Sequence, residues 1–216
     1  MSAGASSGNP GLGALEALRR FARPPTAEER CDLCDAPLAP DHQHLVELAT
    51  RKLVCACQAC GILFGNQAAA RFRAVPRRVE LLADFRLTDA QWEGLHLPVN
   101  LAFFLHNSVA GRVVAVYPSP AGATESLLPL DAWQALVEEN PVLSELEPDV
   151  EALLVHRVAQ AREHYRVGID ECYKLAGLLR LHWSGFSGGT VVWEEIGRFF
   201  ADLKRRSQTG GGSSHA

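Results

Sequence analysis

The sequence has no apolar run that approaches the roughly 18 to 20 residues needed to cross a membrane as a helix, so we expect no membrane span. It also lacks an excess of positive charge. The 21 Lys and Arg residues face 25 Asp and Glu residues, a net charge of −4, which argues against a generally basic nucleic-acid-binding protein. The first ten residues show neither a cationic start nor an apolar segment, so we expect no secretory signal and a cytoplasmic protein.

Motifs of common catalytic chemistry are missing as well. The chain has no P-loop, no dinucleotide-binding fingerprint and no HExxH pair. Gly185-Phe-Ser187-Gly-Gly189 matches the G-x-S-x-G pattern of a nucleophile elbow, but an elbow requires a strand before the serine, and here a helix is predicted. We interpret the glycines as a connection between two helices and expect a protein that is not an enzyme.

Charge divides the chain into two parts. Residues 1–78 carry 10 Lys and Arg against 7 Asp and Glu, a net +3, and the remainder carries 11 against 18, a net −7. Hydrophobic residues make up 47% of the chain, enough for a buried core. We predict a flexible tail with a short helix at 1–25, a metal-binding module at 26–65, a basic connector at 66–78, an α+β domain at 79–206 and a disordered tail at 207–216.

Five of the six cysteines lie within 30 residues. Cys31 and Cys34 form one CxxC pair and Cys57 and Cys60 a second, with 22 residues between the pairs. Without a secretory signal a metal site is favoured over a disulfide framework. Two CxxC turns can place four thiolates around one ion at metal–sulfur distances of about 2.3 Å. The spacing therefore predicts a small four-cysteine module resembling a zinc ribbon or treble clef.

Further potential ligands lie inside this module. Cys55 is two residues from Cys57 on a predicted strand, and His42 and His44 have the same separation, so each pair is expected to share a face. Cys55, His42 or His44 could replace one of the four CxxC ligands, or could contact these ligands without binding the ion itself. The histidines could equally be ordinary surface residues. Gly61, directly after the last cysteine, is expected to allow a tight turn through a positive φ.

The spacing leaves the identity of the ion open. Zinc is the expected metal because a closed four-thiolate site suits a redox-inert ion. The same thiolates could hold rubredoxin-like iron or an iron–sulfur cluster, which would make the protein an electron carrier. Cys172 is a different case: it lies on the apolar stripe of a predicted helix and is expected in the core.

From Val79 onward the pattern is that of an α+β domain. Because strands follow one another without regular βαβ alternation, we predict an antiparallel sheet packed with helices. The predicted strands are residues 101–106 and 113–117, joined by a turn at 108–111, and residues 125–128 and 150–156. The predicted helices begin at the capping box Thr88-x-x-Gln91, at Asp131 (ending at Asn140-Pro141), at Asp170 and at about Thr190, the last with Trp193, Ile196, Phe200 and Leu203 inward.

Four arginines, Arg71, Arg73, Arg77 and Arg78, gather in the predicted connector. They could bind a phosphate backbone beside a zinc module, which gives zinc-dependent nucleic-acid binding as a third function. A solvated connector, or ion pairs with the acidic second part, explains them more simply. We therefore expect no nucleic-acid partner.

Several segments of the chain are long enough to be specific. They are Cys31-x-x-Cys34, His44-Leu45, Cys55-Ala-Cys57-x-x-Cys60, Leu87-Thr-Asp-Ala-Gln-Trp92, Tyr117-Pro-Ser-Pro-Ala-Gly-Ala-Thr-Glu-Ser126, Asn140-Pro-Val-Leu143, Glu147-Pro-Asp-Val-Glu-Ala-Leu-Leu154 and Trp183-Ser-Gly-Phe-Ser-Gly-Gly189. Over about residues 30–203 the chain resembles a bacterial family of unknown function, often encoded beside genes for nickel–iron uptake hydrogenases and their maturation factors. The resemblance carries no established activity. It implies an association with hydrogenase assembly or function, with a hydrogenase subunit or maturation protein as partner.

Overall fold

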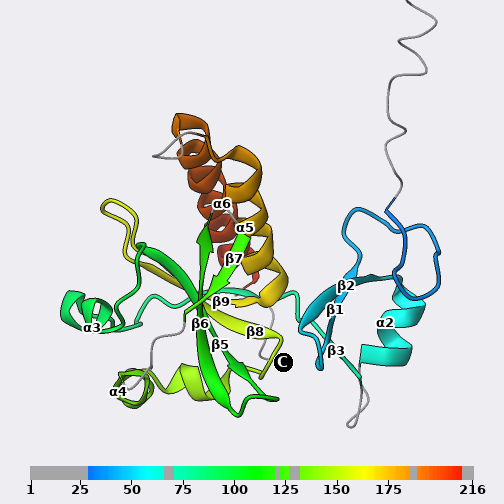
Figure 1. Cartoon of the computed structure of the whole chain (residues 1–216), viewed down its shortest axis with the longest axis horizontal. Coiled ribbons are helices and arrows are strands. Elements are labelled where there is room, and N and C mark those ends of the chain that lie inside the picture. Colours follow the sequence, from blue (N-terminus) through cyan, green and yellow to red (C-terminus); the bar gives the residue numbers. More distant parts are fainter. Residues whose placement is uncertain (1–28, 66–70, 120–121, 127–131, 185–188, 211–216) are drawn as a thin grey trace, which may run out of the picture.

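A computed structural model describes residues 29–65, 71–119, 122–126, 132–184 and 189–210 of the chain. Two antiparallel sheets, one of three strands and one of six, organise these residues and lie side by side (Figure 1). The predicted helix before residue 25, the turn around Ser187 and the last six residues lie outside the described part.

The smaller sheet carries the cysteines. Its central strand β1 (Gln43–Glu47) pairs with β2 (Lys52–Ala56) and with β3 (Phe72–Ala74), and α2 (Gln58–Gly65) follows β2 directly. Strand β3 lies in the segment predicted as a basic connector, so the small sheet extends beyond residue 65. A strand of three residues is too short to show an alternating pattern in the sequence.

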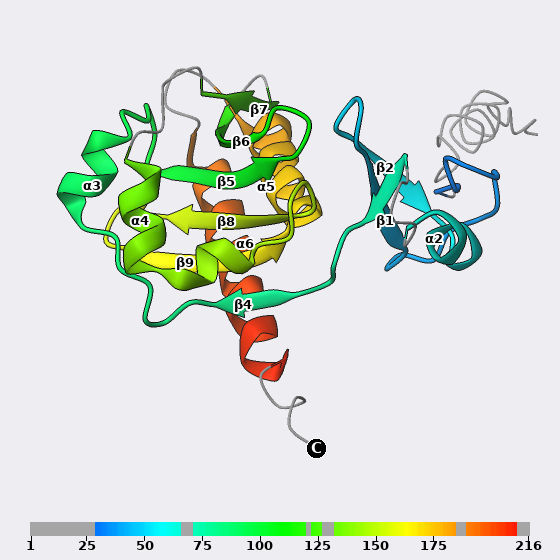
Figure 2. The ribbon, with the colours of Figure 1, turned by 90° about the horizontal axis from the view of Figure 1, so that it is seen from below.

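The larger sheet is built from strands in the second part of the chain. They are β4 (Val79–Leu81), β5 (Leu101–Asn107), β6 (Arg112–Ser119), β7 (Gly122–Glu125), β8 (Glu151–His156) and β9 (Glu163–Gly168), in the spatial order β4-β9-β8-β5-β6-β7. The helices are α3 (Asp89–Gly94), α4 (Trp133–Glu139), α5 (Ile169–His182) and α6 (Gly189–Gly210), with a 3₁₀ turn at Pro141–Glu145. Figure 2 shows α5 and α6 on one face of the sheet and α3 and α4 on the other. The predicted α+β class with an antiparallel sheet is confirmed.

Both faces of the larger sheet are covered by apolar side chains. Successive residues of a strand point to opposite faces, so Phe103 packs in the core beneath α5 and α6, whereas Phe104 packs with Trp92 and Leu136 beneath α3 and α4. Cys172 is fully buried in the first of these cores, as predicted. None of the helices in the described part is both long and apolar enough to cross a bilayer.

The helix starts follow the sequence signals in part. Thr88 and Gln91 form the predicted capping box, in which each side chain accepts a hydrogen bond from the backbone N–H of the other residue. The predicted cap at Asp170 is wrong, because α5 already begins at Ile169 and the residue at its N-terminal boundary is Gly168. Glycine is needed there, since a Cβ would lie 2.4 Å from the carbonyl oxygen of Pro76.

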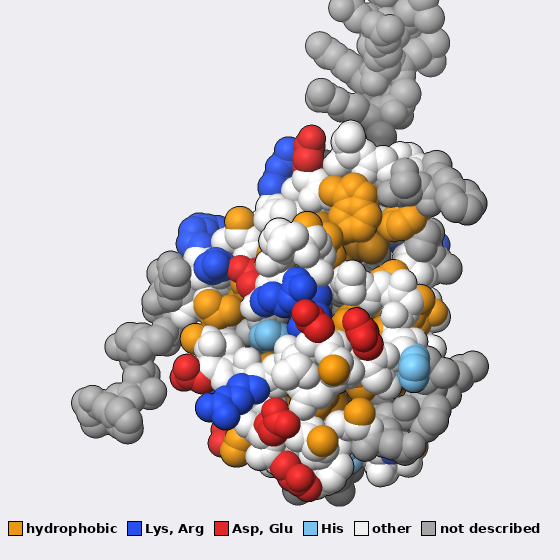
Figure 3. Space-filling model, turned by 90° about the vertical axis from the view of Figure 1, so that its left-hand side faces the viewer, with side chains coloured by type: hydrophobic (Ala, Val, Ile, Leu, Met, Phe, Trp, Pro, Cys, Tyr) orange, Lys and Arg blue, Asp and Glu red, His pale blue; other side chains and the backbone are white. Residues whose placement is uncertain are grey.

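Helix α6 turns the predicted face to the core, with one exception. Ile196, Phe200 and Leu203 are buried as predicted, and Val192 is buried with them. Trp193 is 44% exposed, so the prediction that it points inward is wrong. Trp193 lies about 100° around the helix from Val192, outside the buried stripe. It lines an apolar cavity of about 280 Å³ together with Tyr117 and Leu179. Figure 3 shows hydrophobic side chains gathered on the face of the larger unit that points away from the cysteine module.

Candidate metal centre

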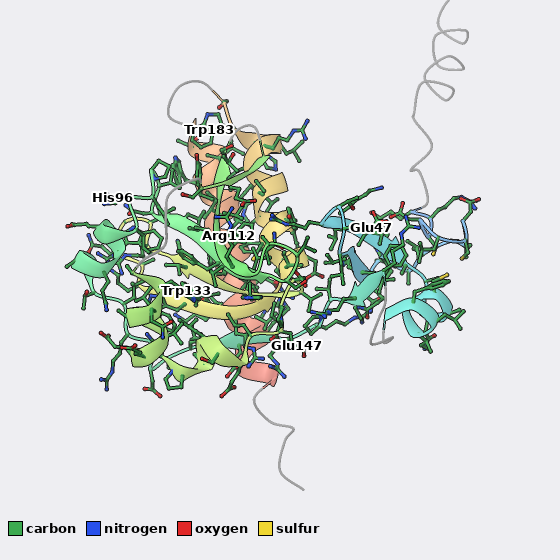
Figure 4. The ribbon with its side chains drawn as sticks, turned by 60° about the horizontal axis from the view of Figure 1, so that its bottom comes forward. Glu47, His96, Arg112, Trp133, Glu147 and Trp183 are labelled. Carbon is green, nitrogen blue, oxygen red and sulfur yellow. The ribbon has the colours of Figure 1, made fainter. Side chains whose placement is uncertain are left out.

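The four CxxC cysteines come together in the structure. The sulfur atoms of Cys31, Cys34, Cys57 and Cys60 all lie within 4.8 Å of one another, and those of Cys34 and Cys57 are 3.7 Å apart. A tetrahedron with metal–sulfur distances of about 2.3 Å has edges of about 3.8 Å. The predicted clustering is therefore confirmed, and the group has the dimensions of a four-thiolate metal site. Figure 4 shows sulfur atoms beside α2, at the outer end of the small unit.

A tight turn shapes the first CxxC pair. The Cys31 N–H donates to the carbonyl oxygen of Ala36 at 2.8 Å, and the Asp35 N–H donates to the carbonyl oxygen of Cys31 at 2.8 Å. The turn passes through the left-handed region at Asp35, whose φ is +62°. Aspartate tolerates this conformation better than most residues other than glycine. The first two thiols are thus held by backbone geometry rather than by a large core.

The second pair lies at the junction of β2 and α2. The Gly61 N–H donates to the carbonyl oxygen of Cys57 at 2.8 Å as the first helical turn forms. The predicted positive φ at Gly61 is wrong, because this residue lies within α2. Its small size matters for packing instead: a Cβ would come within 3.2 Å of Cγ of Gln43.

Hydrogen bonds connect the first CxxC turn to β2. The Asp32 N–H donates to the carbonyl oxygen of Cys55 at 2.9 Å, and the Cys55 N–H donates to Oδ2 of Asp32 at 2.7 Å. Beneath these contacts lies a small core in which Leu45 and Val54 pack against the buried Cys31. Two segments that are distant in sequence are therefore joined behind the sulfur cluster.

The thiols of the cluster differ in how readily they ionise. Burial opposes ionisation of Cys31, but hydrogen bonds from the backbone N–H groups of Cys57, Leu33 and Cys34 outweigh it and lower its pKa to about 6. Burial, together with the neighbouring thiols, raises the pKa of Cys60 to about 12. A bound cation would relieve the repulsion among the sulfurs and favour the thiolate form of all of them.

The other predicted candidates form a separate group. Potential ligand atoms of His42, His44 and Cys55 lie within 4.8 Å of one another. Cys55 and Cys57 join different groups, contrary to the expectation that they share a face. Strand β2 ends at Ala56, and the chain turns into α2 before the two-residue alternation is completed.

The four arginines of the predicted connector contact carboxylates. Arg73 and Arg78 pair with Asp149 and Glu151 of the acidic second part, as the ion-pair interpretation predicted. The other two pair within the small unit, Arg71 with Glu47 and Arg77 with Asp41. Figure 4 labels Glu47 on the small unit. Pairing with carboxylates leaves less positive charge available for a phosphate backbone.

Comparison with known proteins identifies one family. A match to a family described as "Family of unknown function (DUF5947)" covers residues 30–207, which include both sheets and all four CxxC cysteines. Comparisons with curated proteins and with solved structures give no match. The resemblance to a family of unknown function is thus confirmed, and the family description names no hydrogenase. The chain belongs to the DUF5947 family.

Proposed function

We propose that the protein is a non-catalytic accessory protein in which zinc holds the cysteine module in shape for binding a subunit or maturation protein of a nickel–iron hydrogenase. The observation that carries the proposal is the group of four cysteine sulfurs with tetrahedral dimensions. The class of partner comes from the resemblance to a family encoded beside hydrogenase genes.

The donor set supports zinc in a structural role. Four thiolates fill every position of a tetrahedral ion, so no position is left for a substrate or an activated water molecule. Cys31 and Cys60 are 3% and 6% exposed, so half of the ligands are shielded from solvent. In such a site the ion contributes to folding rather than to chemistry.

An apolar surface next to this site supports a role in binding a protein. Ile62 and Phe64 of α2, just after Cys60, are 66% and 40% exposed. Leu63 between them is 60% exposed, so three consecutive apolar side chains of a short helix are accessible to solvent, which is typical of interaction surfaces. Helix α2 carries both this surface and a ligand cysteine, so loss of the ion would also disturb the surface.

The identity of the ion can be tested by metal analysis of the full chain purified without chelator. We expect the Cys34→Ser variant to contain at least one zinc equivalent less than the wild type, because three thiolates leave the ion open to water. The Cys172→Ser variant should match the wild type, since Cys172 is buried in the other core. Stoichiometric iron with visible absorption, or equal zinc in the Cys34→Ser and wild-type proteins, would contradict the proposal.

The partner can be tested by binding to purified hydrogenase subunits and maturation proteins encoded beside the gene. We expect Ile62→Glu to weaken binding about tenfold or more, because a charge would replace an apolar contact, while the zinc content stays unchanged. Val109→Glu is the matched control, since Val109 is equally exposed, at 68%, in the turn between β5 and β6. Equal binding by both variants, or no binding by the wild type, would argue against this partner or this surface.

A further inference from the structure

His42, His44 and Cys55 form a second cluster where the small sheet meets α5. His44 on β1 lies directly opposite Cys55 on β2, which brings their side chains together on one face. His42 precedes His44 by two residues and faces the same way. Their potential ligand atoms lie within 4.8 Å of one another, apart from the four CxxC sulfurs.

The hydrogen bonds of His42 fix which ring nitrogen is available. Nδ1 lies 3.0 Å from the carbonyl oxygen of Ala39 and 3.6 Å from a carboxylate oxygen of Glu29. Both are acceptors, so Nδ1 carries the proton and Nε2 presents a lone pair. Nε2 is buried without a hydrogen-bond partner among the described residues, and the side chain is only 7% exposed. A buried polar atom without a partner is costly, and a metal ion would satisfy it.

In His44, too, Nδ1 is the ring nitrogen that has a hydrogen-bond partner. Its Nδ1 lies 2.9 Å from Oδ2 of Asp170 on α5, so its Nε2 is also left as a potential ligand. A carboxylate that accepts the other N–H of a histidine is the usual support of a metal-binding imidazole. The two rings are 4.8 Å apart and meet edge to face at 68°.

We propose that His42, His44 and Cys55 bind a second ion, divalent zinc, with two imidazole nitrogens and one thiolate as its protein ligands. Imidazole and thiolate together select a metal of intermediate softness. Three protein ligands leave one coordination position, and both histidines line a cavity of about 630 Å³ through which water can reach it. This ion is therefore more accessible than the one among the four cysteines, and the second site does not depend on the hydrogenase partner. It rests on the proposed function in one respect, because the four-cysteine ion keeps the small sheet, which carries His44 and Cys55, folded.

The number of ions bound by the full chain tests the second site. Apo-protein prepared with chelator and reductant is titrated with zinc in competition with a chromophoric chelator. We expect two equivalents in the wild type and one in Cys55→Ser. Cys34→Ser should bind none, because it loses the four-cysteine ion that keeps the small sheet, and with it the second site, folded. Cys172→Ser and His96→Asn should keep two, since neither residue belongs to either group.

Asp170→Asn gives a readout that does not depend on removing a ligand. Losing the supporting carboxylate should lower the affinity of the second site for zinc about 10- to 100-fold, while the affinity of the four-cysteine site stays unchanged. One equivalent in the wild type, retained in Cys55→Ser, would overturn the second site and leave the proposed function intact. If Cys55→Ser loses zinc and Cys34→Ser loses no zinc, the second site is supported and the four-cysteine zinc site of the proposed function is contradicted.

Discussion

Cys31→Ser is expected to release the ion of the four-cysteine cluster and to unfold the small sheet, while the six-stranded sheet remains folded. Among the described residues, the buried cluster inside the small unit consists of Cys31, Leu45, Val54, Ala56 and Cys60, and two of these are ligands. Structural zinc contributes about 10–16 kcal/mol of apparent binding free energy in zinc-finger peptides. The free energy of unfolding of a whole domain is only about 5–15 kcal/mol. A core as small as this one therefore cannot replace the contribution of the ion.

Cys31 is the most informative of the four ligands. Its sulfur accepts hydrogen bonds from the backbone N–H groups of Leu33 and Cys34 in its own turn and of Cys57 in the second. It therefore holds both CxxC segments even before a metal is considered. A serine hydroxyl at this position is a weaker ligand and does not ionise at neutral pH, so both the metal bond and the strong amide contacts are lost.

Hydrogen exchange combined with metal analysis provides the measurement. Amides of β1, β2 and β3 should lose protection in Cys31→Ser, and those of β5 and β8 should keep it. Cys172→Ser is the control: it should retain the metal and lose only about 0.5–3 kcal/mol of stability through disturbed packing. Retained protection in β1 to β3, or an unchanged metal content, would show that the cysteines do not hold the small unit together.

The four-cysteine group was predictable because a CxxC turn is local. Each pair forms within four residues, so the spacing alone indicates which sulfurs converge. The separate group of His42, His44 and Cys55 depends on a longer-range fact, the register that places His44 opposite Cys55 across β1 and β2. It also depends on β2 ending at Ala56. Neither the register nor the end of the strand is encoded in a local pattern.

Strand β9 shows a different limit of sequence patterns. Three of its six residues, Glu163, His164 and Arg166, are polar or charged, so the segment does not resemble a buried strand. Its burial is nevertheless extensive, because its charges find partners far away in the sequence: Glu163 pairs with Lys204 of α6, and Arg166 with Glu151 of β8. Charged residues are buried when they are paired, and pairing is a property of the tertiary structure.

Arg166→Met is expected to lower the free energy of unfolding of the larger unit by about 3–5 kcal/mol, because it leaves a buried carboxylate without its main partner. The side chain of Glu151 is 0% exposed and that of Arg166 is 8% exposed. Nε and Nη2 of Arg166 donate to the same oxygen of Glu151 at 2.9 and 2.6 Å. After the substitution the Glu147 N–H still donates to the same oxygen at 3.0 Å, and Arg78, 3.4 Å from the other oxygen, is the one cationic side chain of the described residues that still pairs with Glu151.

A double-mutant cycle separates the cost of the orphaned charge from lost packing. Glu151→Leu added to Arg166→Met should recover much of the stability, because a well-packed apolar pair replaces a desolvated ion pair. Glu145→Gln is the control: Glu145 also pairs with Arg166 but is 68% exposed, so its loss should cost about 1 kcal/mol or less. Urea unfolding at saturating zinc provides the measurement. A cost for Arg166→Met as small as that of Glu145→Gln would mean that Glu151 does not depend on Arg166, and that the Glu147 N–H and Arg78, in the segment joining the two sheets, are enough to hold it.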